Sequence, residues 1–476
     1  MSVLPLSSIT ITEYNDTHNR RLVDIFAPHA NDPWAILFDN CDSTKSDGRF
    51  SIMLWQPVRT VTAYQGQTRT HCLLTNKKEE IDSPPFEAAE HFLHSMVKPL
   101  SIAPSAPDIA NVLPFMIGVA GMAGYDTGRY YEALPSYAES HYQTEDFAAG
   151  LYLYSLIEDN LTGKMYYCSA DGTTIPNLQT FDRVPKADNQ GFRLTSDWQS
   201  NLSKETYIRC IEKIHDYLKA GDCYQVNFAQ RFTAGFSGSV WQAYEALRVA
   251  NQAPFSAYMK LANSSIASIS PERFLKVVNK IVETKPIKGT RPRFADKEED
   301  AASASSLLTA EKDRAENLMI VDLLRNDISK HCVPHSVTVP SLFALESYEA
   351  VHHLVSTVTG VLHDNVSPLK LLASAFPGGS ITGAPKIRAM EVIDELEIHR
   401  RNIYCGSMFY MGFREDLDSS ICIRTLLAEK EQIHCWAGGG IVLDSVPEDE
   451  FQETLDKVSK ILPVLSSQFG SNSDKD

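Results

Sequence analysis

The sequence predicts a mixed α/β fold, in which strands dominate the first third of the chain and helices alternate with strands afterwards. Residues 1–150 consist largely of short apolar runs between polar turns, which is typical of strands. Beyond about residue 195, amphipathic helical stripes and alternating strand patterns follow one another. At 476 residues and 43% hydrophobic content, the chain can form about three domains, or two larger ones that share a core.

The N-terminal part is separated from the rest by a polar segment. Its clearest strand candidates are the apolar runs 34–38 and 115–121. The segment 171–194 carries Pro, Asp and Gly and predicts a linker. We therefore expect an N-terminal subdomain over 1–170, a second subdomain over 195–463, and a flexible tail over 464–476.

A helix and a strand with one polar face open the second subdomain. Ser203 is a predicted N-cap for a helix with one apolar stripe, and Gly221 marks its end. Residues 224–232 then alternate as a strand, so one face is core and the other is polar enough to line a cleft. The polar face carries Gln225, Asn227 and Arg231.

The remaining elements alternate between helices and strands. We expect a helix near 310–324, strands around 336–339 and 353–361, a glycine-rich turn at 376–386, strands at 421–427 and 433–442, and a final helix over 447–462. Arg424 is the only charged residue in the strand predicted at 421–427.

Charge and cysteine content exclude several classes of function. The formal net charge of −16 argues against the broad basic face that a nucleic acid or an anionic membrane requires, so small anions and proteins remain as partners. Nine scattered cysteines without a C-x-x-C pair predict reduced thiols. The N-terminus lacks a signal-peptide pattern and no apolar run approaches the length of a membrane span, so we expect a cytoplasmic protein.

Residues 283–293 concentrate positive charge on this acidic chain. Two lysines and two arginines lie in this short stretch, which predicts an anionic small ligand. Lys288 stands between Ile287 and Gly289, where partial desolvation would lower the pKa of its amine toward that of a neutral nucleophile. The alternative is a solvated basic loop between two strands.

Two pairs of carboxylates stand three residues apart on predicted helices: Asp313 with Glu316, and Glu450 with Glu453. This spacing places each pair on one helical face. Two such faces across a cleft would supply the hard oxygen ligands that Mg²⁺ prefers. The alternative is a set of solvated surface acids, with Glu453 paired to Lys457 four residues further on.

Arg424 and two glycine-rich segments are candidates for binding an anion. An unpaired guanidinium in an apolar strand is costly, so Arg424 needs either a ligand carboxylate, which fits its fork, or an internal Asp or Glu. Segment 378–386 opens a helix and offers backbone amides to an anion, although it lacks the P-loop spacing. Segment 437–441 lets the backbone approach a ligand closely, or simply makes a sharp turn.

Several motifs in a fixed order carry a family resemblance. They are Ser-Pro-Glu-Arg-Phe at 270–274, Pro-Ile-Lys-Gly-Thr at 286–290, and the segments 313–327, 376–386 and 437–442. Together they resemble the chorismate-utilising enzymes, densely over 195–463 and more loosely before, where Gly124, Tyr125 and Asp126 match. The resemblance implies two intertwined α/β subdomains around a β-sandwich of antiparallel sheets with helices outside. It also implies that chorismate and Mg²⁺ bind in a cleft.

The resemblance further implies roles for individual residues. The family's Mg²⁺ ligands match Glu316, Glu453, Glu450 and Asp313. Its grip on the enolpyruvyl carboxylate matches Tyr404 and Arg424. Its other substrate contacts match Gly438, Gly439, Gly440, Lys457, His353, Thr382, Thr290 and Gln225.

Two positions indicate which reaction the resemblance implies. Family members that add water carry a lysine base where this chain has Gln225, and members that form anthranilate typically carry alanine where it has Lys288. Both positions favour a transaminase-class amination at C4 of chorismate, which would serve p-aminobenzoate and folate synthesis. In the implied mechanism Lys288 attacks C2 while the 4-hydroxyl leaves, and Glu272 is the general acid. Ammonia then adds at C4 and expels the lysine.

Ammonia is expected from a separate glutamine amidotransferase subunit. None of the nine cysteines stands in a G-x-C-x-G setting, and Cys223 comes closest without the second glycine. Related anthranilate-forming enzymes also bind tryptophan near an L-L-E-S-type motif in the N-terminal region. The matching segment here, 37–41, has Asn40 in place of the serine, so the sequence does not decide whether a tryptophan site is retained.

Two other functions stay as alternatives. The chain could form anthranilate, or it could be a non-catalytic homologue that binds chorismate without turnover. A nucleic-acid module at 285–293 is disfavoured, because no aromatic residues are interleaved with its cations.

Overall fold

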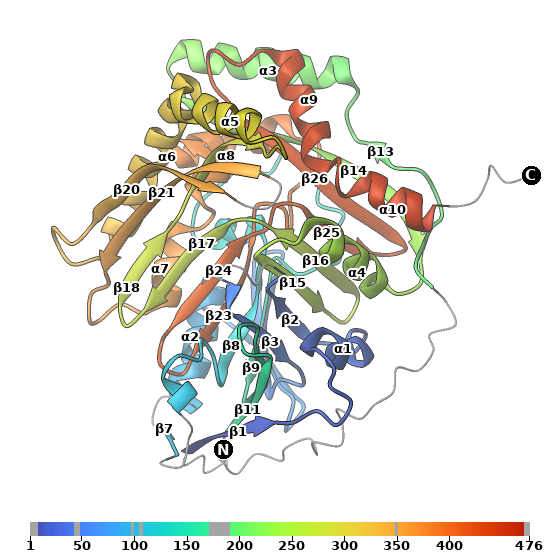
Figure 1. The fold of residues 1–476 in the computed structure, drawn as a ribbon, viewed down its shortest axis with the longest axis vertical. Coiled ribbons are helices and arrows are strands. Elements are labelled where there is room, and N and C mark those ends of the chain that lie inside the picture. Colours follow the sequence, from blue (N-terminus) through green and yellow to red (C-terminus); the bar gives the residue numbers. More distant parts are fainter. Residues whose placement is uncertain are drawn as a thin grey trace, which may run out of the picture.

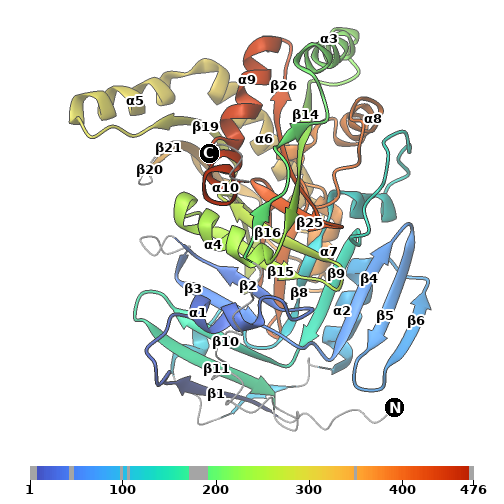
Figure 2. The same ribbon diagram turned by 90° about the vertical axis from the view of Figure 1, so that its right-hand side faces the viewer.

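Two large β-sheets that share an apolar core form the centre of the protein (Figure 1). The computed structural model describes residues 8–41, 48–96, 100–103, 108–170, 191–347 and 351–470. Within these residues almost all strand pairs are antiparallel, with β1 and β7 as an exception, and helices lie outside the sheets (Figure 2). The predicted fold class, antiparallel sheets with helices outside, is confirmed.

The first sheet contains 14 strands in the described part of the chain. In order across the sheet they are β12 (Arg193–Leu194), β14 (Gln225–Ser237), β26 (Gln432–Ile441), β25 (Thr425–Glu429), β16 (Ser264–Ser270), β15 (Phe255–Lys260), β2 (Ile36–Asp39), β3 (Phe50–Leu54), β10 (Tyr154–Asp159), β11 (Lys164–Ala170), β1 (Ser8–Tyr14) and β7 (Ser101–Ile102). Two short strands, β13 (Gln199–Ser200) and β22 (Gly383–Ala384), pair with β14 beside this path.

The second sheet contains 12 strands among the described residues. Their order is β19 (Ile287–Pro292), β21 (Val351–Val361), β18 (Ile281–Thr284), β17 (Arg273–Val278), β24 (Leu417–Ile421), β23 (Ser407–Gly412), β8 (Gly118–Ala123), β9 (Phe147–Tyr152), β4 (Arg59–Tyr64), β5 (Gln67–Cys72) and β6 (Lys77–Ile81). The twelfth strand, β20 (Thr338–Ser347), pairs with β21.

Both sheets contain strands from the two halves of the sequence. In the first sheet β15 pairs with β2, and in the second β23 pairs with β8. The larger apolar core joins residues of both sheets. The two subdomains are therefore intertwined, as the family resemblance implied. Residues 171–190 of the predicted linker lie outside the described residues, while 193–194 form β12.

The helices cover the outer faces of the sheets (Figures 1 and 2). The α-helices of the described residues are α1 (Leu22–Phe26), α2 (Pro85–Met96), α3 (Lys204–Ala220), α4 (Val240–Asn251), α5 (Lys297–Thr309), α6 (Glu311–Ser329), α7 (Pro368–Ala375), α8 (Lys386–Leu396), α9 (Pro447–Val458) and α10 (Leu462–Phe469). The short helices η1 (Ala27–His29), η3 (Asp108–Asn111), η4 (Tyr125–Tyr130) and η6 (Gly379–Ile381) connect other elements. Within the described ranges, no helix combines the length and the apolar character of a membrane crossing.

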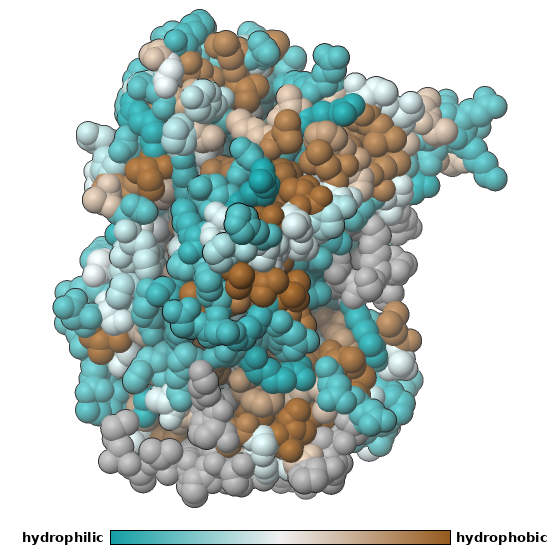
Figure 3. All heavy atoms as spheres, turned by 90° about the vertical axis from the view of Figure 1, so that its left-hand side faces the viewer, coloured by the Kyte–Doolittle hydropathy of each residue, from teal (hydrophilic) through white to brown (hydrophobic). Residues whose placement is uncertain are grey.

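Helix α5 and strand β19 project from one side of the molecule (Figure 2). Figure 3 shows this projection in profile at the upper right, and its tip is hydrophilic, in keeping with the Lys-Glu-Glu-Asp start of α5. Only Leu307 of α5 is buried, and it packs next to Gly289 of β19. Helix α5 therefore adds little to the core, but it covers the strand that carries Lys288.

The predicted helix and polar-faced strand at the start of the second subdomain are confirmed. The Ser203 hydroxyl oxygen accepts a hydrogen bond from the backbone N–H of Thr206 at 3.2 Å, which caps α3. Gly221 ends the helix in a left-handed conformation with φ of 81°. Gln225 and Asn227 on the polar face of β14 are both buried, so this face lies inside the protein.

The strand predicted at 421–427 is wrong, because the chain bends within it. β24 ends at Ile421 and β25 begins at Thr425. Arg424 lies in the connection with a left-handed φ of 51°, which a continuous strand does not allow. The bend takes Arg424 out of the sheet.

The predicted final helix, 447–462, is two helices. α9 ends at Val458 and α10 begins at Leu462, because Pro463 has no backbone N–H to continue the hydrogen bonding of α9. α10 runs to Phe469 and buries Leu462 and Leu465. The predicted flexible tail is therefore wrong for residues 464–469.

Candidate active site

The two predicted carboxylate faces meet over the glycines of β26. A Cβ atom on Gly439 would lie 3.2 Å from Glu450 Oε2 and 3.4 Å from Glu453 Oε1, both on α9. A Cβ atom on Gly440 would lie 3.3 Å from Glu316 Oε1, on α6. The missing side chains of the two glycines therefore leave room for three carboxylates, Glu316, Glu450 and Glu453, which we call the carboxylate cluster.

Asp313, the fourth predicted Mg²⁺ ligand, is engaged elsewhere. Its Oδ2 accepts a hydrogen bond from Arg291 Nη2 at 2.9 Å, and its side chain packs against Gly289. The i,i+3 spacing does place Asp313 and Glu316 on one side of α6, but only Glu316 faces the glycines of β26.

Lys288 reaches the carboxylate cluster from a bulge in β19. The pairing of β19 with β21 shifts register between Ile287 and Thr290, and Gly289 takes a left-handed φ of 80°. Lys288 Nζ lies 2.9 Å from Glu316 Oε1, and its side chain is 15% exposed. The predicted desolvation of the amine is confirmed, and the alternative of a solvated basic loop is wrong for Lys288.

The predicted lowering of the Lys288 pKa is wrong for this arrangement. Burial lowers the pKa, but the charge and hydrogen bond of Glu316, followed by the charges of Glu272 and Glu453, raise it above its ordinary value. The apolar neighbours in the sequence indicated only the burial. Of the compensating carboxylates, Glu316 and Glu453 come from helices distant along the chain and Glu272 from the connection before β17, which no local pattern reveals.

Glu272 lies beside Lys288 with its side chain buried. Burial raises the pKa of Glu272 to about 7, although the charge of Lys288 and a hydrogen bond from the backbone N–H of Ile287 act in the opposite direction. Its own backbone N–H donates to Ser270 Oγ at 3.2 Å and its carbonyl accepts from the N–H of Ile421, which fix its position. A carboxyl group with this pKa keeps a proton near neutral pH, as a general acid must.

The carboxylate cluster has the donor chemistry of a Mg²⁺ site, with each member held by a protein group. Glu316 pairs with Lys288, Glu453 Oε1 lies 2.5 Å from Lys457 Nζ, and Ser445 Oγ donates to Glu450 Oε1 at 2.6 Å. Burial raises the pKa of Glu450, and the nearby charge of Glu453 adds to this. Such crowding of carboxylates suits a cation.

As the side chains stand, no three His, Cys, Asp or Glu residues among those described are grouped closely enough to enclose an ion. Each of the three carboxylates has a lysine partner instead: Lys288 at Glu316, Lys457 at Glu453, and Lys312 at 3.8 Å from Glu450. The Mg²⁺ ligand set therefore stays a prediction.

Arg424 is half-buried and has no ion pair or side-chain hydrogen bond within the described residues. Burial lowers its pKa, and no neighbouring carboxylate opposes this. The alternative of an internal Asp or Glu partner therefore finds no support, and an incoming anion is the remaining partner. Tyr404 is buried and stacks on Trp436, with ring centroids 6.1 Å apart and an interplanar angle of 6°.

The other predicted substrate contacts divide between the cluster and its surroundings. Lys457 Nζ donates to the carbonyl oxygen of Gly438 at 2.8 Å, which joins it to the same glycines. Thr290 and His353 are opposite each other on β19 and β21, with Thr290 Oγ1 2.9 Å from His353 Nδ1. Thr382 is fully buried and donates to the carbonyl oxygen of Gly378, so its hydroxyl serves the glycine-rich turn.

Gln225 is fully buried next to Gly440. Both polar atoms of its side-chain amide lack a hydrogen-bond partner within the described residues, and Nε2 lies 2.1 Å from where a Cβ atom of Gly440 would stand. Buried amides are normally hydrogen-bonded, so this one is available to a bound molecule.

Sequence reasoning missed Arg401 and Glu397, which form a fully buried ion pair behind Tyr404. Their spacing of four is typical of an exposed helical pair, and nothing local marks them as buried. The chorismate-type motifs did include Tyr125, whose ring lies on Arg401.

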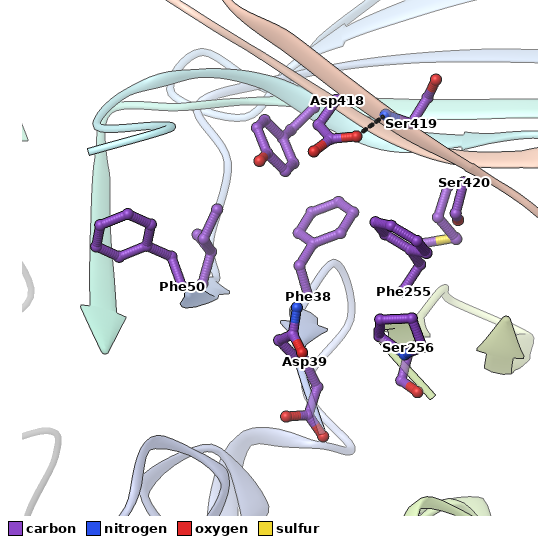
Figure 4. A pocket seen from close by; sticks show the side chains of 13 residues that line it. Phe38, Asp39, Phe50, Phe255, Ser256, Asp418, Ser419 and Ser420 are labelled. Carbon is purple, nitrogen blue, oxygen red and sulfur yellow. Dashed lines mark hydrogen bonds between the residues drawn. The ribbon is translucent and has the colours of Figure 1, made fainter. Parts of the chain in front are cut away.

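The segment 37–41 borders a separate pocket, which β15, β23 and β24 of the second half of the chain also line (Figure 4). The rings of Phe38, Phe50 and Phe255 surround it, and Asn40 is among its lining residues. The neighbouring Asp39 carboxylate is held by Arg248. The pocket lies where the tryptophan site was considered, and occupation by tryptophan stays a prediction.

Known proteins resemble this chain along most of its length. An aminodeoxychorismate synthase component 1 from Salmonella typhimurium is 46% identical over 93% of this chain and 95% of its own. The protein of the same name from Escherichia coli is 45% identical over 91% of this chain and 93% of its own.

A solved structure and a family pattern agree with these relatives. The crystal structure of anthranilate synthase component I from Streptococcus pneumoniae has a TM-score of 0.74 at 29% identity, and covers 87% of this chain and 92% of that one. The pattern that describes chorismate binding enzymes matches residues 36–463. With the carboxylate cluster, Lys288 and Glu272 arranged as described, these matches show that the chain belongs to the chorismate binding enzyme family.

Proposed function

We propose that the chain converts chorismate and ammonia into 4-amino-4-deoxychorismate, as the chorismate-binding component of an aminodeoxychorismate synthase. One observation carries the proposal: the amine of Lys288 is buried against the carboxylate cluster, beside a Glu272 whose pKa is raised to about 7. Relatives that are 45–46% identical along the chain carry the corresponding name. The product would serve p-aminobenzoate and folate synthesis.

The two carboxylates of chorismate would be held at separate places. Arg424, which has no anionic partner in the described structure, supplies the guanidinium for the enolpyruvyl carboxylate. The backbone of Gly438, Gly439 and Gly440, with Lys457, lies beside the carboxylate cluster and would hold the ring carboxylate. This arrangement would orient C2 of the ring toward Lys288.

Lys288 has to lose its proton before it attacks, because only the neutral amine is a nucleophile. Its ion pair with Glu316 opposes that loss, so the pair must open when substrate binds. The amine then bonds to C2, the ring double bonds shift, and the C4–oxygen bond breaks as Glu272 donates its proton and water leaves.

Ammonia completes the exchange. It bonds to C4, the ring double bonds shift back, and the bond between C2 and the Lys288 nitrogen breaks. Glu272, now ionised, can accept the proton that the new amino group releases. Two displacements by positioned groups thus replace one difficult direct substitution.

The carboxylate cluster supplies the type of oxygen donor that a divalent cation takes. Glu316, Glu450 and Glu453 would hold it, and Asp313 is left out because it is engaged with Arg291. When bound, Mg²⁺ would neutralise the ring carboxylate of the substrate.

Ammonia would come from a glutamine amidotransferase subunit. The name "component 1" of the relatives implies a second component in their enzymes. All nine cysteines of this chain are free, and burial raises the pKa of Cys223, the thiol with the nearest sequence context to a glutaminase nucleophile. An inert thiol of this kind does not suit glutamine hydrolysis.

Product analysis tests the proposed function. Purified protein incubated with chorismate, Mg²⁺ and ammonium is expected to form 4-amino-4-deoxychorismate, identified by chromatography and mass spectrometry. Glutamine in place of ammonium is expected to give no product from this chain alone. A fluorescent anthranilate product would support the anthranilate-forming alternative, and binding without turnover would support the non-catalytic one.

Mg²⁺ titration by calorimetry tests the ligand set. Glu316→Gln and Glu453→Gln are each expected to weaken Mg²⁺ binding by about tenfold or more, because each removes one charged ligand. Asp313→Asn is the matched control and should leave the affinity within about twofold. Equal losses in all three variants would contradict the assignment.

A further inference from the structure

Arg401 lies against Tyr404, one of the predicted substrate contacts of the candidate active site. It is 1% exposed, and its guanidinium forms two hydrogen bonds with Glu397, of 2.9 Å from Nε and 2.6 Å from Nη2. Such a bidentate pair fixes the plane of the guanidinium. Glu397 in turn accepts a hydrogen bond from the backbone N–H of Ala229 on β14, at 3.0 Å.

The remaining hydrogen bonds of Arg401 reach two elements of the substrate site. Nη2 donates to the carbonyl oxygen of Asn227 on β14 at 2.7 Å, and Nη1 donates to that of Ile381 in the glycine-rich turn at 3.0 Å. These elements are also joined directly, since the N–H of Asn227 donates to the carbonyl oxygen of Thr382 at 2.8 Å. Arg401 therefore reinforces the junction between β14, which carries Gln225, and the turn, whose strand β22 also pairs with β14.

The faces of the guanidinium are covered by two tyrosine rings. The Arg401 Cζ atom is 4.8 Å from the ring centroid of Tyr125 and 5.5 Å from that of Tyr404. Tyr404 is a predicted contact of the enolpyruvyl carboxylate, and its ring also stacks on Trp436. A rigid cation stacked on a ring limits the positions that the ring can take.

The N-terminal half of the chain holds this arrangement in place. The N–H of Tyr125 donates to the carbonyl oxygen of Asn402 at 2.6 Å, and Asp126 Oδ2 accepts from the N–H of Asn402 at 3.0 Å. A Cβ atom on Gly124 would lie 2.8 Å from that same carbonyl oxygen, so the close approach needs glycine. The Gly-Tyr-Asp motif at 124–126 thus clamps the residue next to Arg401.

We infer that Arg401 is a positioning residue for chorismate binding, held by Glu397 and by Tyr125, and that it keeps Tyr404, β14 and the glycine-rich turn in the arrangement that receives the substrate. This inference rests on the proposed function, because it takes Tyr404 as a substrate contact. The Gly-Tyr-Asp motif at 124–126 takes no part in the proposed chemical steps, and this inference gives it a role in positioning.

Variants of Arg401 and Tyr125 test the inference. Arg401→Lys keeps the charge but loses the fork, and it is expected to raise KM for chorismate at least ~10-fold while kcat changes less than ~3-fold. Tyr125→Leu removes the ring and should shift KM in the same direction. Tyr125→Phe is the matched control, because the Tyr125 hydroxyl has no hydrogen-bond partner in the described residues, and it should behave as the wild type.

A spectroscopic readout separates positioning from general stability. In protein labelled with fluorotryptophan, the ¹⁹F resonance of Trp436, assigned with Trp436→Phe, should move in Arg401→Lys and Tyr125→Leu because Tyr404 stacks on that ring. It should stay in place in Tyr125→Phe and in Arg49→Lys, which loses a bidentate pair with Asp159 elsewhere in the fold.

The outcomes distinguish this inference from the proposed function. A folded Arg401→Lys with unchanged KM and an unchanged Trp436 resonance would overturn the positioning role. If Arg401→Lys does not fold, the contrast between Tyr125→Leu and Tyr125→Phe decides instead, and equal behaviour of these two overturns it. Absence of amination by the wild type would defeat the proposed function, while chorismate binding and the Trp436 resonance would still test Arg401.

Discussion

Replacement of Lys288 by alanine is expected to lower the rate of amination by at least ~10³-fold while chorismate still binds within about tenfold of the wild-type affinity. The proposed mechanism passes through a bond between the Lys288 nitrogen and C2, and no other amine in the described structure is paired with Glu316. Binding depends mainly on other groups, including Arg424 and the glycines of β26. Ammonium-dependent turnover measures the first effect and calorimetry the second.

Lys285→Ala is the matched control for this prediction. Lys285 lies in the same basic stretch but pairs with Glu346 at 3.8 Å, away from the carboxylate cluster. Its loss should change turnover less than about threefold, as is usual for a partly exposed ion pair. Wild-type turnover in purified Lys288→Ala would refute the nucleophile.

Mass spectrometry offers an independent check of the same step. Without ammonia, the wild type should accumulate chorismate minus water on the peptide that contains Lys288, and Lys288→Ala should not. An adduct on another lysine would reassign the nucleophile while keeping the covalent mechanism.

Replacement of Glu272 by glutamine is expected to lower kcat by ~10²–10⁴-fold, the usual contribution of a general acid. In the wild type, kcat should fall as pH rises through about 7, because Glu272 loses the proton that it gives to the leaving hydroxyl. The residual activity of Glu272→Gln should lack this limb of the pH profile. An unchanged profile in the variant would show that another group titrates.

The same substitution should alter the dependence of stability on pH. The pKa of Glu272 rises from 4.5 to about 7 on folding, so the folded state binds this proton more tightly than the unfolded state. Stability is therefore lost as pH increases from about 4.5 to 7, by on the order of 3 kcal/mol for this group. Glu272→Gln lacks this loss, so its free energy of unfolding in urea should increase relative to that of the wild type as pH rises from 5 to 8. Glu283→Gln, in strand β18 and more exposed, is the control.

Local sequence patterns predicted the elements whose form is decided by local chemistry. The Ser203 cap and the Gly221 end of α3 are visible as residue types, and so is the alternation of β14. Helix α5 escaped prediction because it buries only Leu307, so no apolar stripe marks it. The bend at Arg424 escaped because a left-handed arginine is imposed by the surrounding sheets and not by its neighbours.

The family motifs predicted more of the candidate site than the local chemistry of its residues did. The spacing of Glu450 and Glu453 correctly placed both on one face of α9. The pKa of Lys288 was predicted in the wrong direction, because Glu316 and Glu453 reach it only after folding. Arg401 was missed for the same reason, since its partners Tyr125 and Asn227 are far away in the sequence.

The pairing of β23 with β8 has a consequence for synthesis on the ribosome. When the first half of the chain has emerged, β8 has β9 on one side and an unpaired edge on the other, because residues Ser407–Gly412 have not been made. β2 likewise has an unpaired edge until β15 has been made. Open edges of this kind invite pairing with other nascent chains, so this protein gains more than a two-domain enzyme of equal length from chaperones that cover exposed strands until translation ends.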